Sequence, residues 1–297
     1  MLEVTILKVK HSGYEEAKKL EHYIEQCDVF SPEAAFYTEE IASIEEKCWL
    51  ELLKLSGSRV NKLLSKSPKQ LYDPVNNEAI PIDFMHYRNK LYNLLHKYRK
   101  PIYCLERFSE GEIKNIKGDY SKEYSEGVKL LYTGRVNRAL DIFRINFFRC
   151  FNEQVNLRDL HIAKNIDDAE EGIREKFKDI SAKSTIRLVT NIGLCHEPEK
   201  YVIRYSPKIV CLYDDVGELT KKELQLLDLA RNKEEISDLE LLRKALIVSI
   251  ERGLFKELNR SEIIDDGRMM TFDKINKLEY NDLCEIIKQI ASKFVVK

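Results

Sequence analysis

The chain has 297 residues, of which 43% are hydrophobic and 33% are charged, a composition typical of folded globular proteins and not of disordered ones. Its 49 basic and 50 acidic residues give a net charge of −1. This balance argues against non-specific nucleic-acid binding, which depends on an excess of positive surface charge. The length allows one large domain or two small ones, and we expect a single α/β domain over residues 1–297.

The sequence predicts a soluble cytoplasmic protein. We expect no signal peptide and no membrane span, because no apolar run approaches the length of about 20 residues that a spanning helix needs. The seven cysteines are scattered through the chain and none are spaced as CxxC. Their odd number and their spacing favour free thiols over disulfides or a zinc site.

The N-terminal part of the chain predicts a strand, a helix and a second strand. Residues 2–10 are rich in β-branched side chains and lead to His11. Apolar residues at helical spacing follow over 15–26. The run Val29-Phe30 begins a short second strand, which leads to Glu33.

A similar arrangement recurs near residue 190. The apolar run 186–192 leads through Gly193 to His196. A second apolar run, 209–213, follows and leads to Asp214. Each half therefore has a strand that ends near a histidine and a second strand that ends near a carboxylate, as a duplicated unit would.

The remainder of the chain predicts mostly helix. We expect helical insertions over about 38–100 and 120–180, and a helical C-terminal region over 220–297. A further strand, 101–106, ends on a carboxylate. Because strands alternate with helices, we expect an α/β fold with a small, mostly parallel sheet. Two duplicated βαβ halves would form this sheet, with a large helical layer or insertion beside it.

Five side chains fall at or just after the ends of predicted strands: His11, Glu33, Glu106, His196 and Asp214. Sites in open parallel sheets lie at the carboxyl ends of the strands. Imidazole and carboxylate groups together suit Zn²⁺, Mn²⁺, Fe²⁺ or Co²⁺. A site without a metal ion can use the same groups as general acid and base.

Each of these residues also has a purely structural interpretation. His11 could cap the helix that follows it, and Glu33 could stabilise a helix N-terminus through the helix dipole. Glu106 could belong to an exposed ion pair, and Asp214 could belong to a turn. His196 is the strongest candidate, because a glycine lies in the turn that presents it.

Arg158 is a separate candidate. It occupies one stripe of a predicted helix whose other members are apolar, namely Phe151, Val155, Ile162 and Ile166. Either the side chain extends outward to solvent, or it points into the site and binds a carboxylate or a substrate anion. His161, about one turn further along, could face the same cleft.

The motif Gly193-x-x-His196 after a strand is similar to the GxxH motif of the TraB/Tiki superfamily, which includes the ChaN-like and erythromycin-esterase-like proteins. The segment Arg158-Asp159-x-x-Ile162-Ala163 resembles the helix motif of that family. His11 would be its first histidine and Glu33 its first glutamate. The likeness extends over about residues 1–215.

The chain departs from the family pattern at two places. The segment Lys8-Val9-Lys10-His11 lacks the glycine of the first motif, and Leu157 stands where the family has a glutamate before the arginine. The resemblance implies metal-dependent hydrolysis of a peptide, ester or amide bond, with a peptide or small molecule as substrate.

On this interpretation His11, Glu33 and His196 hold a divalent metal ion, which polarises a carbonyl group and lowers the pKa of a bound water. Glu106 or Asp214 acts as the base. Arg158 holds the substrate or the developing oxyanion.

Two other interpretations stay open. The two departures favour a non-catalytic regulatory or ligand-binding protein on the same fold, which would hold no metal ion. Alternatively, the charged helices over 220–293 form an interaction module that docks a partner or a second copy of the chain.

Overall fold

A computed structural model describes residues 1–10, 14–33, 37–64, 82–109, 111–113, 120–213, 218–232, 234–251, 275 and 277–295. The chain forms two compact units: unit 1 consists of Met1–Lys117 and Gln154–Val216, and unit 2 consists of Gly118–Glu153 and Gly217–Lys297. The sequence led us to expect one domain. Within the chain, the first part of the predicted insertion 120–180 packs with the C-terminal helices in unit 2.

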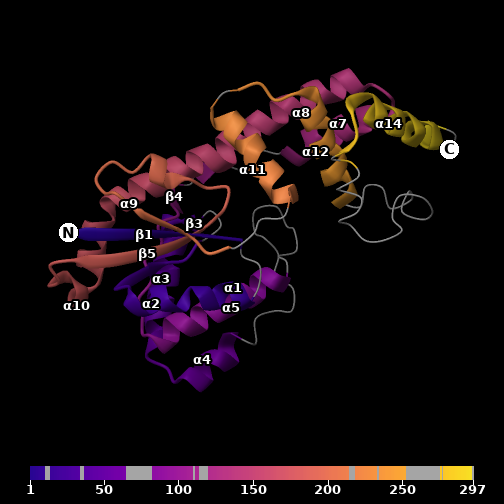
Figure 1. Cartoon of the computed structure of the whole chain (residues 1–297). Coiled ribbons are helices and arrows are strands. Elements are labelled where there is room, and N and C mark those ends of the chain that lie inside the picture. The colour runs from indigo at the N-terminus through magenta and orange to yellow at the C-terminus, as the bar shows by residue number, and fades with distance from the viewer. Residues whose placement is uncertain are drawn as a thin grey trace. The chain divides into compact units, whose positions relative to one another are not determined.

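A parallel sheet forms the centre of unit 1 (Figure 1). Its strand order is β2-β5-β1-β6, and its strands are β1 (Leu2–Val9), β2 (Val29–Ser31), β5 (Ile186–Gly193) and β6 (Lys208–Cys211). The central strands β1 and β5 pair along their whole length, from Leu2 opposite Ile186 to Val9 opposite Gly193. The predicted fold class, α/β with a small parallel sheet, is confirmed.

The two predicted halves interleave within this sheet. Strand β5 lies between β1 and β2, and strand β1 lies between β5 and β6. The first crossover contains helices α1 (Tyr14–Lys19) and α2 (Glu21–Gln26). The second crossover contains only a short 3-10 helix, η2 (Pro198–Lys200). The halves therefore share their strand arrangement but differ in how their strands are connected.

The predicted strand over 101–106 runs beside β2 as extended chain. Phe30 N–H donates to Pro101 O at 3.1 Å, and Tyr103 N–H donates to Phe30 O at 3.0 Å. Regular strand pairing begins only after this segment, where β4 (Arg107–Phe108) pairs with β3 (Tyr37–Thr38) in a separate small sheet.

Helices cover both faces of the central sheet (Figure 1). Helices α1, α2, α3 (Glu39–Leu53) and α5 (Ile82–Lys97) contribute to the core on one face, and α4 (Gly57–Leu64) packs at its margin. Helices α9 (Leu157–Lys176) and α10 (Lys178–Ser181) contribute to the core on the other face. Successive strand residues point to opposite faces, so Ile6 packs on the α9 side and Leu7 on the α5 side.

Unit 2 is helical in its described residues, which form α7 (Tyr120–Tyr132), α8 (Val136–Cys150), α11 (Glu218–Arg231), α12 (Asp238–Glu251) and α14 (Tyr280–Val295). Gly134 has a φ of +71° and makes the turn between α7 and α8. A π-helical segment, η1 (Phe151–Asn156), continues directly into α9. Helix α9 continues without a break through Asp167 and Asp168.

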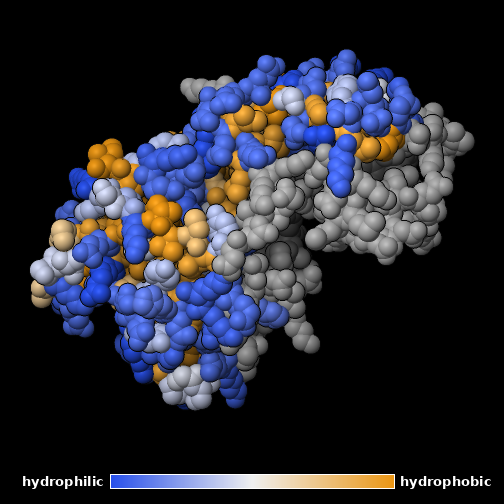
Figure 2. All heavy atoms as spheres, viewed as in Figure 1, coloured by the Kyte–Doolittle hydropathy of each residue, from blue (hydrophilic) through white to orange (hydrophobic). Residues whose placement is uncertain are grey.

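Most side chains visible in Figure 2 are hydrophilic, with smaller hydrophobic groups between them. This is the pattern expected of amphipathic helices that bury their apolar side. None of the described helices is both long enough and apolar enough to span a membrane.

Replacing Ile6 with alanine should destabilise unit 1, because Ile6 is 0% exposed in the middle of β1. Large-to-small changes of this kind cost about 2–5 kcal/mol in the free energy of unfolding. Urea unfolding followed by the fluorescence of Trp49 measures this cost, since Trp49 is the only tryptophan and is buried in unit 1, in the core on the other face of the sheet. The matched control is Ile203→Ala: Ile203 is 88% exposed, so we expect a change below about 0.5 kcal/mol. Equal effects of the two substitutions would contradict the assigned core.

Candidate functional site

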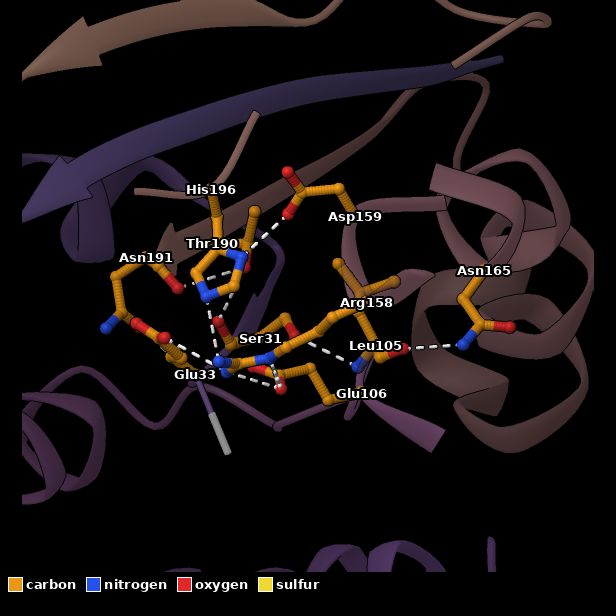
Figure 3. A network of polar contacts seen from close by, with 10 residues as sticks. All are labelled: Ser31, Glu33, Leu105, Glu106, Arg158, Asp159, Asn165, Thr190, Asn191 and His196. Atoms are coloured by element: carbon orange, nitrogen blue, oxygen red, sulfur yellow. Dashed lines mark hydrogen bonds and ion pairs between the residues drawn. The ribbon is translucent and has the colours of Figure 1, made fainter. Parts of the chain in front are cut away.

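Polar side chains meet where the carboxyl ends of the parallel strands lie beside the first turn of α9 (Figure 3). Glu33 follows β2 and His196 follows β5. Glu106 ends the extended segment beside β2, and Arg158 lies in the first turn of α9. Parallel strands bring their ends to one edge of the sheet, so residues far apart in the chain converge there.

Arg158 is at the centre of this network. Its Nε donates to Glu106 Oε2 at 2.7 Å, and its Nη2 lies 2.6 Å from the same oxygen. Nη2 also donates to Glu33 Oε1 at 3.0 Å, and Nη1 lies 2.8 Å from His196 Nε2. The Arg158 side chain is 11% exposed. Of its two predicted orientations, it therefore adopts the one that points into the site.

The charge of Arg158 is stabilised by its carboxylate partners. Burial opposes a charged guanidinium, but Glu106 and Glu33 outweigh this effect and raise the pKa of Arg158. The arginine therefore stays protonated and acts as a donor at every contact.

His196 is fixed between Arg158 and Asp159. Its Nδ1 lies 2.7 Å from Asp159 Oδ1, and the Glu197 N–H donates to Asp159 Oδ2 at 2.8 Å. Since Arg158 can only donate, Nε2 must accept from it, which leaves the ring proton on Nδ1, where it is donated to Asp159. The contacts thus describe a neutral imidazole with one defined tautomer.

Opposing effects act on the pKa of His196. Burial and the charge of Arg158 lower it, whereas the neighbouring side chains of Cys195 and Asp159 raise it, and the net shift is upward. If Arg158 Nη1 moves away, one of the two lowering effects is lost. This upward shift favours the protonated ring, whereas the contact with Arg158 requires a neutral one, because Arg158 can only donate to Nε2. The contact geometry decides for the neutral ring, and the ring becomes a stronger base when that contact breaks.

The backbone beside Glu33 is held from β5. The Glu33 N–H donates to Asn191 Oδ1 at 3.2 Å, and Asn191 Nδ2 donates to the Tyr87 hydroxyl at 3.1 Å. Burial raises the pKa of Tyr87, with Glu16 and Glu33 adding to the shift, so this hydroxyl stays protonated.

Lys8 holds the turn that presents His196. It is only 6% exposed, and its Nζ donates to His196 O and, at 2.9 Å, to Glu199 Oε2. A buried lysine is costly unless it is paired, and these two acceptors satisfy it while fixing the backbone of the turn.

The structure brings together four of the predicted site residues: Glu33, Glu106, Arg158 and His196. The other two, His11 and Asp214, lie outside the described residues. His161 does not join the network through its ring: its Nε2 lies 3.3 Å from Glu112 Oε1, and the ring makes an edge contact with Phe108.

Sequence reasoning assigned no role to Asp159, Asn191 or Lys8. Asp159 stands next to Arg158 in the helix motif, which could have identified it. Asn191 is an amide inside an apolar strand run, and Lys8 is a charge inside another. A polar residue in a buried strand needs a partner, so both positions carried a usable signal.

The described donors do not fit a divalent metal ion in this arrangement. Among the residues that the structure describes, no three histidine, cysteine, aspartate or glutamate side chains are grouped as a metal site. The guanidinium of Arg158 lies among Glu33, Glu106 and His196, so a cation already occupies the point where these donors converge. The predicted ligand set also includes His11, which lies outside the described residues.

The chain matches no protein-family model, and neither the curated proteins nor the solved structures contain a match to it.

Replacing Arg158 with methionine should destabilise unit 1 strongly, because Glu33, Glu106 and His196 would all lose this partner. Breaking a buried ion pair in this way costs about 3–5 kcal/mol. Urea unfolding followed by Trp49 fluorescence measures the loss. The control is Arg204→Met, since Arg204 is 64% exposed and pairs with Asp168 at 3.7 Å; we expect at most about 1 kcal/mol there. A loss at Arg158 as small as that of the control would show that the network contributes little to stability.

Proposed function

We propose that the chain is a hydrolase of peptide, ester or amide bonds in which His196 is the general base. The observation that carries this proposal is the contact set of one ring: Nδ1 on Asp159 and Nε2 facing Arg158, at the carboxyl edge of the sheet. A base oriented by a carboxylate and placed beside a cation is an arrangement suited to acyl transfer.

Asp159 has the orienting role in this proposal. By accepting the Nδ1 proton it keeps the lone pair on Nε2, which is the atom that takes a proton from the attacking water. It also stabilises the imidazolium that forms. His196 then returns the same proton to the leaving group, so the ring ends the reaction in its starting state.

Arg158 has the electrophilic role. Its Nε and Nη2 are anchored on Glu106, whereas its Nη1 contacts the uncharged ring. A substrate carbonyl oxygen that takes over the Nη1 donor would gain charge stabilisation and would free Nε2 to act as a base. Preorganised donors at a developing oxyanion supply a large part of the rate enhancement in such reactions.

Glu106 suits the role of anchor better than that of base. It is 3% exposed, and its Oε2 accepts from two nitrogens of Arg158. Glu33 is more exposed, at 14% of its side chain, and binds Arg158 through one contact. In the proposed reaction we therefore assign the role of general base to His196 instead of Glu106. A role of Asp214 as the base stays a prediction from the sequence.

A non-catalytic ligand-binding protein is the second candidate. The observation that favours it is that His196 is 3% exposed and its Nε2 is already engaged by Arg158. A protein that only binds a ligand would keep this contact closed. A peptide or small-molecule substrate, a cytoplasmic location and a homo-oligomeric state all remain proposals from the sequence.

His196→Gln should abolish hydrolysis, because glutamine cannot accept and return a proton. We expect a rate at least about 100-fold lower than that of the unmodified chain, measured with p-nitrophenyl acetate as the ester probe and a fluorogenic peptide mixture as the amide probe. His161→Gln is the control, since His161 lies on α9 but contacts Glu112, and it should keep the rate. Equal rates for the two variants would refute the assigned base, and an inactive unmodified chain would favour the second candidate.

Hydrolysis should continue in EDTA, because Arg158 supplies the positive charge at the point where the described donors converge. The measurement is the same p-nitrophenyl acetate assay before and after chelation, followed by addition of Mn²⁺ or Zn²⁺. A loss of activity that either ion reverses would instead support the metal site of His11, Glu33 and His196 that the sequence predicts.

A further inference from the structure

Asn165 contacts the backbone on both sides of Glu106, and Figure 3 shows its contact with Leu105. Its Nδ2 donates to Leu105 O at 2.6 Å and lies 3.4 Å from Arg107 O. Asn165 lies about two turns after Arg158 on α9, and so on the same side of the helix. One face of α9 therefore holds the carboxylate of Glu106 through Arg158 and the adjoining backbone through Asn165.

Two further contacts fix the same segment from other elements. The Leu105 N–H donates to Ser31 Oγ at 3.1 Å, and the Cys104 N–H donates to Glu46 Oε1 at 2.7 Å. Leu105 is 1% exposed, so its carbonyl would lose an important partner without Asn165. None of these contacts involves Arg158.

The contacts that hold the Glu106 segment do not depend on Arg158, and the proposed reaction, on which the present inference rests, requires this. Nη1 of Arg158 has to exchange His196 for the substrate while Nε and Nη2 stay on Glu106. The exchange is productive only if Glu106 keeps its place when the guanidinium shifts.

We propose that Asn165 is a positioning residue for Glu106 and, through it, for Arg158. It clamps the backbone of the Glu106 segment to α9, so that Glu106 provides a fixed anchor on which the guanidinium reorients. Asn165 itself touches neither the base nor the reacting atoms.

The test uses the Arg158 Nε–H signal in nitrogen-15 NMR spectra of the full chain, because this proton is donated to Glu106 and reports on the anchor directly. The signal is assigned by its loss in Arg158→Lys. In Asn165→Ala we expect its exchange with solvent to rise by about tenfold or more, since a hydrogen bond to a buried charged group becomes less persistent. Asn165→Ser, which keeps a donor, should show a smaller increase.

Asn156→Ala is the matched control. It removes an asparagine at the start of the same helix, whose Oδ1 accepts from the Tyr201 hydroxyl at 2.7 Å, and it should leave the Arg158 signal unchanged. Backbone spectra establish that each variant is folded, and Asn165→Ser serves if Asn165→Ala is not. An unchanged Arg158 signal in a folded Asn165 variant, or an equal change in Asn156→Ala, would overturn the inference.

Activity measurements separate the positioning role of Asn165 from the proposed hydrolase function. With p-nitrophenyl acetate, Asn165→Ala should lower kcat by about tenfold while KM changes little, because the anchor acts on the reaction step and not on binding. If Asn165→Ala lowers the stability of the chain but does not lower kcat at nearly constant KM, the role of Asn165 is purely structural. If the unmodified chain hydrolyses nothing, the proposed function fails, while the NMR measurement still decides whether Asn165 positions Arg158.

Discussion

Parallel pairing of β1 with β5 is the constraint on which the rest of unit 1 depends. The two strands are distant in sequence, yet they align from Leu2 opposite Ile186 to Val9 opposite Gly193. The pairing buries apolar side chains on both faces, so α9 packs on one side and α5 on the other. Because the strands run in the same direction, it also brings the turn that carries His196 to the same edge as the residues after β2. The register of β1 against β5 thus determines both the core of unit 1 and the position of the candidate site.

Charge burial at this edge is tolerated because every described member of the network has a partner of suitable type. Arg158 meets two carboxylates, His196 meets Asp159, and the buried Lys8 meets Glu199. Such a network stabilises the fold less than apolar packing of equal volume would, since its groups lose hydration. The network places charged groups in a dry environment, which is the environment that the proposed hydrolytic chemistry would use.

Much of the fold and part of the site could be predicted from the sequence. Apolar runs of β-branched residues identified the strands, and their ends identified Glu33, Glu106 and His196. The division into two units could not be predicted, because periodicity shows which helices are amphipathic but not which apolar faces meet. The orientation of Arg158 was open for a similar reason: an arginine in an apolar stripe fits both burial and exposure. Asn165 gave no local signal, since its partners are backbone carbonyls of a distant segment.

The uneven connections of the two halves also affect how the edge of the sheet at β6 is protected. The second crossover carries no α-helix, and β6 lies at one end of the four described strands, with exposed residues on both faces. End strands offer backbone groups to the strands of other molecules, which is a route to aggregation. Strand β6 is short and begins with the exposed Lys208, and a short, charged end strand is a poor template for further strand addition. The charge of Lys208 therefore disfavours strand addition at an edge whose crossover from β5 contains no α-helix.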